Sequence, residues 1–361
     1  MYPFFRSLLF RLDPEIAHHL TLKLISVGGF RPVNAILRRM YSMRPKPVKA
    51  FGLTFQNPIG LAAGYDKDGI AIRGLAALGF GHIEIGTVTP RPQDGNPKPR
   101  VFRLLEDEAV INRMGFPSRG SEFVQRRLNP FLRSGLSERI YGFMPLSKKG
   151  TRTSIDKGTL VLGINLGKNK DTPNEEAVFD YLALLENFAP YADYLTINIS
   201  SPNTVGLRQL QGRVALEALL AQLHVQRQLE ENRLDKKLPL LVKLAPDLSA
   251  SELDDAIDVI LRTHMDGVIA TNTTLSREGL RSSYKEESGG LSGSPLRVQS
   301  EAALRQIVKL VNNKISVVSV GGIMNADDAK RRLDNGAALV QIYTGLIYRG
   351  PGLVKELAQF L

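Results

Sequence analysis

Short apolar runs alternate with helix-like segments along most of the chain. From residue 58 onward, runs of about four to eight apolar residues recur between segments with the periodicity of amphipathic helices. Strands that are covered on both faces need such near-continuous apolar sequences. The pattern therefore predicts an α/β protein built on a closed (β/α)8 barrel, or TIM barrel. The predicted strands are Ile59–Ala63, His82–Val88, Leu160–Leu166, Tyr194–Ile199, Leu238–Leu244, Gly267–Ala270, Ser316–Val320 and Leu339–Tyr343.

Every predicted strand ends in polar residues or glycine. In a barrel, the loops that follow the carboxyl ends of the strands lie on one face and carry the reacting groups. These endings therefore predict a functional site on that face. The endings are Gly64-Tyr65-Asp66-Lys67, Thr87, Asn165, Asn198, Lys243, Thr271-Asn272-Thr273, Gly321-Gly322 and Thr344-Gly345.

The fourth predicted strand runs into a polar turn that is the first candidate for chemistry. The turn places Ser201 between Asn198 and Asn203, so that a hydroxyl that can accept a proton lies between two amides. The alternative is that Ser-Pro-Asn only forms a turn, because each of these residues favours turns. The recurrence of polar strand endings favours the functional interpretation.

Lys243 and two glycine-containing strand ends predict a ligand with electron-rich or anionic groups. Lys243 lies in an apolar strand, where a buried ammonium needs either such a ligand or a structural carboxylate as partner. Gly321-Gly322 and Tyr343-Thr344-Gly345 follow the last two strands, where barrels commonly bind phosphate through backbone N–H groups. Gly289–Gly293 is a further candidate edge of the same pocket.

Four asparagines lie in predicted loops on the strand-end face. Asn112, Asn198, Asn203 and Asn272 each combine donors and an acceptor in one amide, which matches the alternating C=O and N–H edge of a cyclic imide or pyrimidine. Lys67 could hold a carboxylate of the same ligand. The five histidines lie elsewhere, and no metal site is expected.

The composition is that of an ordinary globular chain, long enough for one barrel plus an appendage. It has 361 residues and no cysteine, which excludes disulfides, thiolate metal sites, iron–sulfur ligation and a cysteine nucleophile. Residues 1–50 and 132–160 together carry the whole formal net charge of +11. A basic nucleic-acid-binding module is an alternative, but its charge would lie on the working face. We therefore expect no nucleic acid as partner.

The sequence pattern predicts two parts of the chain. Residues 1–45 form a small helical appendage, and residues 46–361 form the barrel. Residues 2–12 have an amphipathic pattern, and Asp13-Pro14-Glu15 is a typical start for a second helix that runs to about Val27. Charges interrupt both helices, so neither a membrane span nor a signal peptide is expected. The apolar faces and positive charge predict peripheral contact with an anionic membrane surface. The alternative is a helical pair that only packs on the barrel.

Five motifs resemble those of the dihydroorotate dehydrogenases, and specifically the quinone-dependent class 2 of that family. The resemblance covers nearly the whole chain. It implies an FMN-dependent oxidoreductase that oxidises (S)-dihydroorotate to orotate with a quinone as electron acceptor, the redox step of pyrimidine biosynthesis. The motifs are Ala62–Gly69, Ile85–Pro90, Asn112–Phe116, Asn198–Asn203 and Ala270–Thr274.

The resemblance also implies roles for individual residues. Ser201 has the position of the catalytic base, where class 1 enzymes have cysteine. The residues that match flavin-binding positions are Ala63, Gly64, Tyr65, Asp66, Lys67, Thr87, Asn165, Asn198, Lys243, Thr271, Gly293, Gly322, Tyr343 and Thr344. The residues that match pyrimidine-binding positions are Lys67, Asn112, Arg113, Met114, Gly115, Phe116, Asn198, Asn203, Asn272 and Thr273.

In the implied reaction, Ser201 takes the proton from C5 of dihydroorotate while a hydride leaves C6 for flavin N5, and Lys243 stabilises negative charge near N1. A membrane quinone, entering between the two amino-terminal helices, then reoxidises the flavin. The resemblance implies a peripheral protein, expected as a monomer, at the cytoplasmic face of a bacterial cell membrane. A barrel enzyme without redox chemistry, such as a phosphate-binding isomerase or lyase, is the alternative, and it would lack a flavin absorbance band.

Two features depart from the family's pattern. Residues 134–158, rich in Lys, Arg, Ser and Gly, make a longer connection before the third strand than we expect, and we interpret them as a surface loop. Tyr65 stands where Leu or Phe is expected.

Overall fold

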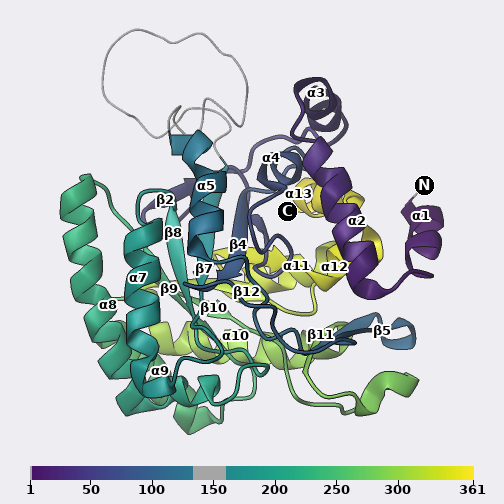
Figure 1. Cartoon of the computed structure of the whole chain (residues 1–361). Helices are drawn as coiled ribbons and strands as arrows, with labels where there is room; N and C mark the ends of the chain where they lie inside the picture. The colour runs from purple at the N-terminus through teal and green to yellow at the C-terminus, as the bar shows by residue number, and fades with distance from the viewer. Residues whose placement is uncertain (1, 133–159) are drawn as a thin grey trace, which may run out of the picture.

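The computed structural model describes residues 2–132 and 160–361, and its centre is a closed barrel of eight parallel strands (Figure 1). The last strand, β13, pairs with the first, β3, and closes the barrel. The predicted α/β barrel is therefore confirmed, with strand ends shifted by no more than two residues. The strands are β3 (Ile59–Leu61), β4 (His82–Val88), β7 (Val161–Leu166), β8 (Tyr194–Asn198), β9 (Leu240–Leu244), β10 (Gly267–Ala270), β12 (Ser316–Val320) and β13 (Leu339–Ile342).

Helices between the strands cover the outside of the barrel (Figure 1). The helix α9 (Ala250–Arg262) shows how the sequence starts them, because Ser249 and Glu252 form a capping box with both hydrogen bonds present. Its apolar positions then face the barrel. The other helices of the barrel are α4 (Ile72–Ala76), α5 (Ser121–Leu132), α7 (Ala177–Phe188), α8 (Arg213–Leu234), α10 (Arg297–Val311), α11 (Ala326–Asp334), α12 (Thr344–Arg349) and α13 (Gly352–Phe360).

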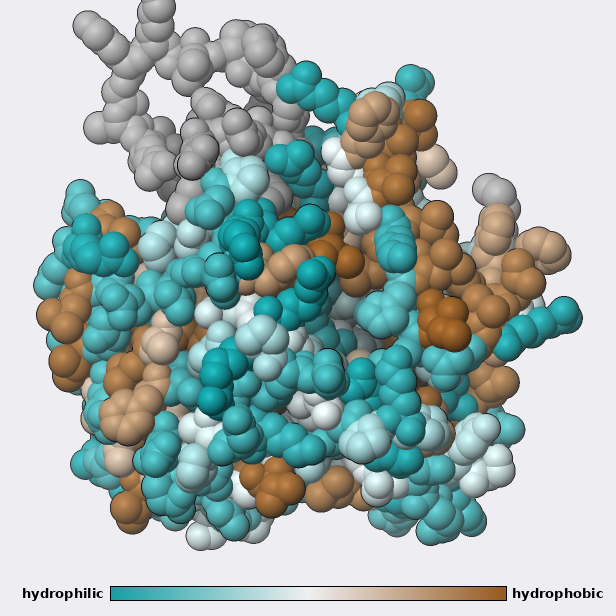
Figure 2. Space-filling model, viewed as in Figure 1, coloured by the Kyte–Doolittle hydropathy of each residue, from teal (hydrophilic) through white to brown (hydrophobic). Residues whose placement is uncertain are grey.

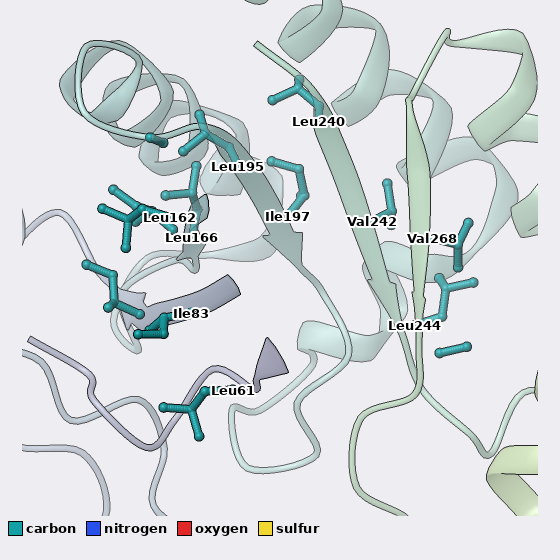
Figure 3. Packing of buried hydrophobic residues seen from close by; sticks show 14 of the residues in the cluster. Leu61, Ile83, Leu162, Leu166, Leu195, Ile197, Leu240, Val242, Leu244 and Val268 are labelled. Atoms are coloured by element: carbon teal, nitrogen blue, oxygen red, sulfur yellow. The ribbon is translucent and has the colours of Figure 1, made fainter. Parts of the chain in front are cut away.

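Successive residues of each strand point alternately to the helices and to the barrel interior. In β9, Leu240, Val242 and Leu244 pack in the large cluster between strands and helices (Figure 3). Leu241 and Lys243 face the interior. Burial of each such aliphatic side chain contributes about 1.5–3 kcal/mol. Because the outer face carries most of this apolar packing, the interior can hold polar groups.

A short hairpin closes the amino-terminal end of the barrel. It consists of β1 (Val48–Ala50) and β2 (Leu53–Phe55), which pair antiparallel. The ring of Phe55 lies 5.3 Å from the buried ring of His82, and burial lowers the pKa of His82 to about 3. The sequence pattern did not predict this hairpin, whose strands are each three residues long.

A three-stranded antiparallel sheet lies beside the opposite end of the barrel. It contains β5 (Val101–Leu104), β6 (Ala109–Asn112) and β11 (Gly290–Gly293), with β6 in the middle. This sheet was also not predicted, because β11 comes from a distant part of the sequence. It brings the expected glycine-rich pocket edge next to Asn112, which pairs with Gly290.

Three amino-terminal helices pack along one side of the barrel (Figure 1, purple). They are α1 (Tyr2–Leu9), α2 (Pro14–Val27) and α3 (Arg31–Met40). The first two were predicted, and the Asp13 carboxylate caps α2 by accepting the N–H groups of the first turn at 2.9 and 3.1 Å. The helix α3 was not predicted.

Specific bonds attach these helices to the barrel. The Tyr2 hydroxyl donates to the Ile347 carbonyl at 2.5 Å, and the buried carboxylate of Glu15 pairs with the buried Arg100 guanidinium at 3.0 Å. In the ranges that the structure covers, no helix has both the length and the apolar character needed to cross a membrane. The basic segment 134–158 lies outside the described residues.

The outward surface of the three helices is unusually apolar. Brown side chains gather over α1, α2 and α3 in Figure 2, although each of these residues is exposed to solvent. We call this surface the amino-terminal apolar face. It consists of Phe4, Phe5, Leu8, Ile16, Leu20, Leu24, Val27, Phe30, Ile36 and Met40.

Candidate active site

The carboxyl ends of the barrel strands surround a cavity that opens to solvent, which we call the barrel-mouth cavity. Ser201 and Lys243 both lie on its wall, so they belong to one site. The predicted site residues on the wall are Ala63, Gly64, Lys67, Thr87, Asn112, Met114, Gly115, Phe116, Asn198, Ser201, Asn203, Lys243, Thr271, Asn272, Thr273, Gly293, Gly322, Tyr343 and Thr344.

Four predicted site residues lie away from this wall. Asp66 accepts two backbone N–H groups at 2.8 Å from the segment before α4 and thereby fixes the loop after β3. Arg113 pairs with Glu287 at 2.5 Å outside the cavity. Tyr65 lines a second cavity, and Asn165 lies behind the wall in the barrel interior. Any ligand contact of these four remains a prediction.

Lys243 points into the barrel next to a buried carboxylate. Its ammonium makes no hydrogen bond with any described residue. Burial lowers the pKa of Lys243, and the nearby Glu84 carboxylate opposes this shift. Glu84 itself accepts hydrogen bonds from Asn165 at 2.8 Å, Tyr194 at 3.1 Å and Gln341 at 2.9 Å. Lys243 therefore faces the cavity and also has the carboxylate that the alternative interpretation required.

A chain of amides leads from Glu84 to the cavity wall. Because a carboxylate only accepts hydrogen bonds, Glu84 turns the Asn165 amide nitrogen toward itself. The Asn165 oxygen then accepts from the Thr87 hydroxyl at 2.6 Å and from the Asn198 amide at 2.9 Å. The Asn198 oxygen accepts in turn from the Asn272 amide at 3.3 Å. The buried carboxylate thus fixes which edge each amide presents.

Ser201 lies in the loop after β8 with only 5% of its surface exposed. Its hydroxyl oxygen accepts the backbone N–H of Asn203 at 3.2 Å and makes no other hydrogen bond with the described residues. The Asn203 side-chain amide donates to the Asn112 oxygen at 3.2 Å, which links this loop to β6. The hydroxyl is therefore held by the backbone and remains open to a ligand in the cavity.

The loop after β12 presents backbone donors to the cavity. Gly321, Gly322 and Ile323 line the wall, and among the described residues their N–H groups have no hydrogen-bond acceptor. Successive free N–H groups of this kind form a concave site that suits an anion. A phosphate is the anion expected at this position of a barrel.

The unpaired polar atoms of the wall indicate what ligand fits. The Thr271 hydroxyl is buried without a hydrogen-bond partner in the described part of the chain, and the Lys243 ammonium faces the same cavity. At Gly64 a side chain would press on the Tyr343 ring, 3.3 Å from the position of its Cβ. A flat heterocycle with a polar edge at Lys243 and a phosphate near Gly322 would satisfy these groups.

Lys67 lies between the barrel-mouth cavity and a second cavity. Its ammonium donates to the Gly64 carbonyl at 2.7 Å, and burial lowers the pKa of Lys67 to about 8. Burial also raises the pKa of Tyr343, which lines both cavities, to about 12. An ammonium at this boundary can bind a carboxylate from the barrel-mouth side.

The second cavity lies between the amino-terminal helices and the barrel, and we call it the helix-side cavity. His18 on its wall is 5.1 Å from Tyr65, measured between ring centroids, and burial lowers the pKa of His18 to about 3. Arg100, paired with Glu15, also lines it. The residues that border both cavities are Lys67, Asn112, Met114, Pro117 and Tyr343.

Several residues of the site were not predicted from the sequence. Glu84 carried the same signal as Lys243, a charge within an apolar strand, but it was not singled out. Gln341 could have been found in the same way, as a polar residue in the last strand. The apolar wall residues Leu296, Ile323 and Met324 carried no signal, because such residues are usually part of the core.

Comparisons with known proteins identify sequences that are similar over the whole chain. Residues 47–361 match the family model described as dihydroorotate dehydrogenase. A dihydroorotate dehydrogenase (quinone) of Idiomarina loihiensis is 46% identical over 361 residues, which is 100% of both chains. One of Paraburkholderia phymatum is 48% identical over 363 residues, covering 100% of this chain and 97% of the relative.

Solved structures give the same result for the fold. A crystal structure of the Eimeria tenella dihydroorotate dehydrogenase in complex with ferulenol has a TM-score of 0.82 and 39% sequence identity. The match covers 96% of this chain and 90% of that one. The ligand-free form of the same enzyme also has a TM-score of 0.82, with 40% identity over 96% and 93% of the two chains.

Proposed function

This chain belongs to the dihydroorotate dehydrogenase family, and from that membership we propose how its two cavities carry out the family's reaction. The protein is an oxidoreductase of pyrimidine biosynthesis that oxidises dihydroorotate to orotate with a quinone as electron acceptor. The family's cofactor is a flavin. One observation supports the residue roles: Ser201, Lys243, the predicted asparagines and the free N–H groups after β12 line a single cavity.

We infer that the flavin is FMN. The ring edge would lie at the Lys243 ammonium and the Thr271 hydroxyl, which make no hydrogen bond with the described residues. The phosphate would lie at the N–H groups of Gly321, Gly322 and Ile323. Held by these residues, FMN would supply the redox chemistry of the reaction, the acceptance of a hydride from the substrate and the donation of electrons to the quinone.

We propose that the pyrimidine binds against the four asparagines of the wall, with its carboxylate on Lys67. Ser201 would take the proton from C5 of the substrate. The backbone N–H of Asn203 positions the Ser201 oxygen, and burial keeps bulk water away from it. The amides ordered by Glu84 would present a fixed pattern of donors and acceptors to the ring.

The quinone would reach the flavin through the helix-side cavity, which shares Lys67, Met114 and Tyr343 with the barrel-mouth cavity. We propose that residues 1–45 form the membrane- and quinone-facing unit and residues 46–361 the catalytic barrel. The amino-terminal apolar face would lie on an anionic membrane surface, in a peripheral arrangement at the cytoplasmic side. A monomer would suffice, since one chain supplies both cavities.

Anaerobic reduction tests the proposed reaction. Dihydroorotate should bleach the flavin absorbance of the purified protein, and a quinone should restore it. Ser201→Ala should keep the flavin bound but slow bleaching by about 10²–10⁴-fold, because the proton acceptor is lost. Stopped-flow absorbance measures this rate.

The neighbouring serine provides a matched control. Ser200 is fully buried and bonds to Asn198 and Asn272, but it does not line the cavity. Ser200→Ala should therefore slow bleaching far less than Ser201→Ala. Bleaching of the Ser201→Ala variant at the wild-type rate would refute the role of Ser201. A purified protein without any flavin band would point instead to a phosphate-binding barrel without redox chemistry.

A further inference from the structure

Arg332 is the largest side chain that the described part of the chain buries completely. It lies on α11, on the outer side of the barrel wall, and does not line the barrel-mouth cavity. The Nη2 atom of its guanidinium lies 3.0 Å from the Gly321 carbonyl oxygen, 2.9 Å from that of Arg297 and 2.9 Å from the Ser300 hydroxyl oxygen, so its two hydrogens are shared among these three acceptors. A buried guanidinium aimed at backbone carbonyls requires a role beyond surface charge pairing.

The bond to Gly321 sets the direction of the next N–H group. The Gly321 carbonyl and the Gly322 N–H belong to one planar trans peptide, in which the two groups point in opposite directions. Because Arg332 holds the carbonyl from outside, the Gly322 N–H points inward, to the cavity that Gly322 lines. Gly322 has φ +72°, and any Cβ would lie 2.3 Å from the Arg297 Cα, so only glycine fits at this position of the loop.

Further bonds hold the same loop from behind. The Ser300 hydroxyl lies 2.9 Å from the Gly321 carbonyl oxygen and 3.1 Å from that of Arg297, so its single hydrogen supports one of them. The Asp328 carboxylate accepts the Met324 N–H at 2.9 Å at the other end of the loop. The Gly321 carbonyl is therefore bound outside the barrel, and among the described residues the N–H groups of Gly321, Gly322 and Ile323 have no acceptor.

The charge of Arg332 acts in the same direction. Its nearest carboxylate, that of Glu301, is 4.0 Å away and is not hydrogen-bonded to it. Burial lowers the pKa of Arg332 to about 10, which leaves the guanidinium charged at neutral pH. A positive charge behind polarised peptides increases the attraction of their N–H groups for an anion.

We propose that Arg332 is a positioning residue for the flavin phosphate, which holds the Gly322 N–H toward the phosphate and gives the site its preference for FMN over riboflavin. The inference rests on the proposed binding of FMN in the barrel-mouth cavity. Riboflavin has the same ring but lacks the phosphate, so it cannot use this contact. The Arg332 variant should therefore lose affinity for FMN and keep its affinity for riboflavin.

Competition between the two flavins tests this proposal. Full-length protein is equilibrated with FMN and a large measured excess of riboflavin, and the bound flavins are separated and quantified. Arg332→Met should reduce the preference for FMN about tenfold, the order expected for loss of a charge-assisted hydrogen bond. Riboflavin affinity should change less than about twofold. Arg332→Lys, which keeps the charge and some of the bonds, should retain part of the preference.

Lys330→Met is the matched control, because Lys330 lies on the same helix but is exposed and pairs with Asp334 at 2.7 Å. It should leave the preference unchanged. An unchanged preference in Arg332→Met, or equal loss of affinity for both flavins, would overturn the proposal. If Arg332→Met does not fold, Ser300→Ala is the second test, and it should lower the preference for FMN over riboflavin about threefold. An unchanged preference in Ser300→Ala would contradict the proposal. A wild-type protein that binds neither flavin would overturn the proposed function as well.

Discussion

Buried charged residues determine the chemistry of the barrel-mouth cavity. Glu84 accepts hydrogen bonds from three side chains in the barrel interior and lies near Lys243. The polar wall therefore depends on a residue that does not touch the cavity. An amide can present either its donor or its acceptor edge to a ligand. A carboxylate behind the wall decides between the two, because it accepts a hydrogen bond only from the donor edge.

The lowered pKa of Lys67 predicts a pH dependence of substrate and product binding. An unperturbed lysine stays charged up to a pKa near 10.5, whereas Lys67 begins to lose its proton near pH 8. Orotate should bind with constant affinity below that pH and about tenfold more weakly for each unit above it, because its carboxylate favours the ammonium form. The perturbation of the flavin spectrum by orotate measures this affinity.

Lys67→Gln provides the control for this profile. The amide does not titrate, so the variant should bind orotate weakly and without the step near pH 8. A wild-type affinity that stays constant from about pH 7 to about pH 9.5 would show that Lys67 does not hold the carboxylate.

At the scale of elements, local sequence determines where an amino-terminal helix begins, but it does not determine what the exposed face of that helix contacts. Asp13 and Pro14 set the start of α2. The exposed side chains of Ile16 and Leu24 then leave a large apolar surface on the outside, while Ala17 and Leu22 pack on the barrel. The exposed side chains support the proposed contact with a membrane, and the buried ones attach the helix to the barrel.

Replacing Ile16 and Leu24 with glutamine should weaken binding to anionic phospholipid vesicles about tenfold or more, because two exposed apolar side chains would no longer enter the lipid. Val214 and Val225 on α8 are similarly exposed, and the same double replacement there is the control. Vesicle sedimentation measures the membrane binding of both variants. Equal loss in the two variants, or no loss in either, would contradict a membrane role for α2.

At the scale of the whole molecule, the barrel interior alternates small and large residues. Gly163 in β7 lies opposite Tyr194, and a Cβ on Gly163 would be 2.2 Å from the tyrosine ring and 2.4 Å from its hydroxyl. The same hydroxyl donates to Glu84. The packing of the closed barrel therefore also holds the polar network below the cavity.

Gly163→Ala should lower the free energy of unfolding by about 1–3 kcal/mol, because the added methyl group has no space beside Tyr194. Gly352 at the start of α13 is the control, since nothing lies within 4 Å of its would-be Cβ. Gly352→Ala should be neutral or slightly stabilising. Urea denaturation of both variants measures the difference, and an unchanged midpoint for Gly163→Ala would contradict this packing argument.

Local sequence patterns were sufficient for most of the barrel. Apolar runs, strand-end polar residues and the cap at Asp13 are each encoded within a few neighbouring residues, and hydrophobic periodicity reports directly on which face is buried. The elements that were missed have weaker local signals. They are the hairpin of β1 and β2, the helix α3, and the sheet in which β11 joins β6.

The sequence by itself determined the fold class, the strand order and the set of polar residues at the strand ends. Only the tertiary structure decided that Lys243 faces both a cavity and Glu84, that Lys67 lies between two cavities, and that Arg332 holds the loop of Gly322 from outside. The physical reason is distance along the chain. Hydrogen bonds and burial between residues that are far apart in sequence depend on the closed barrel, and no local pattern records them.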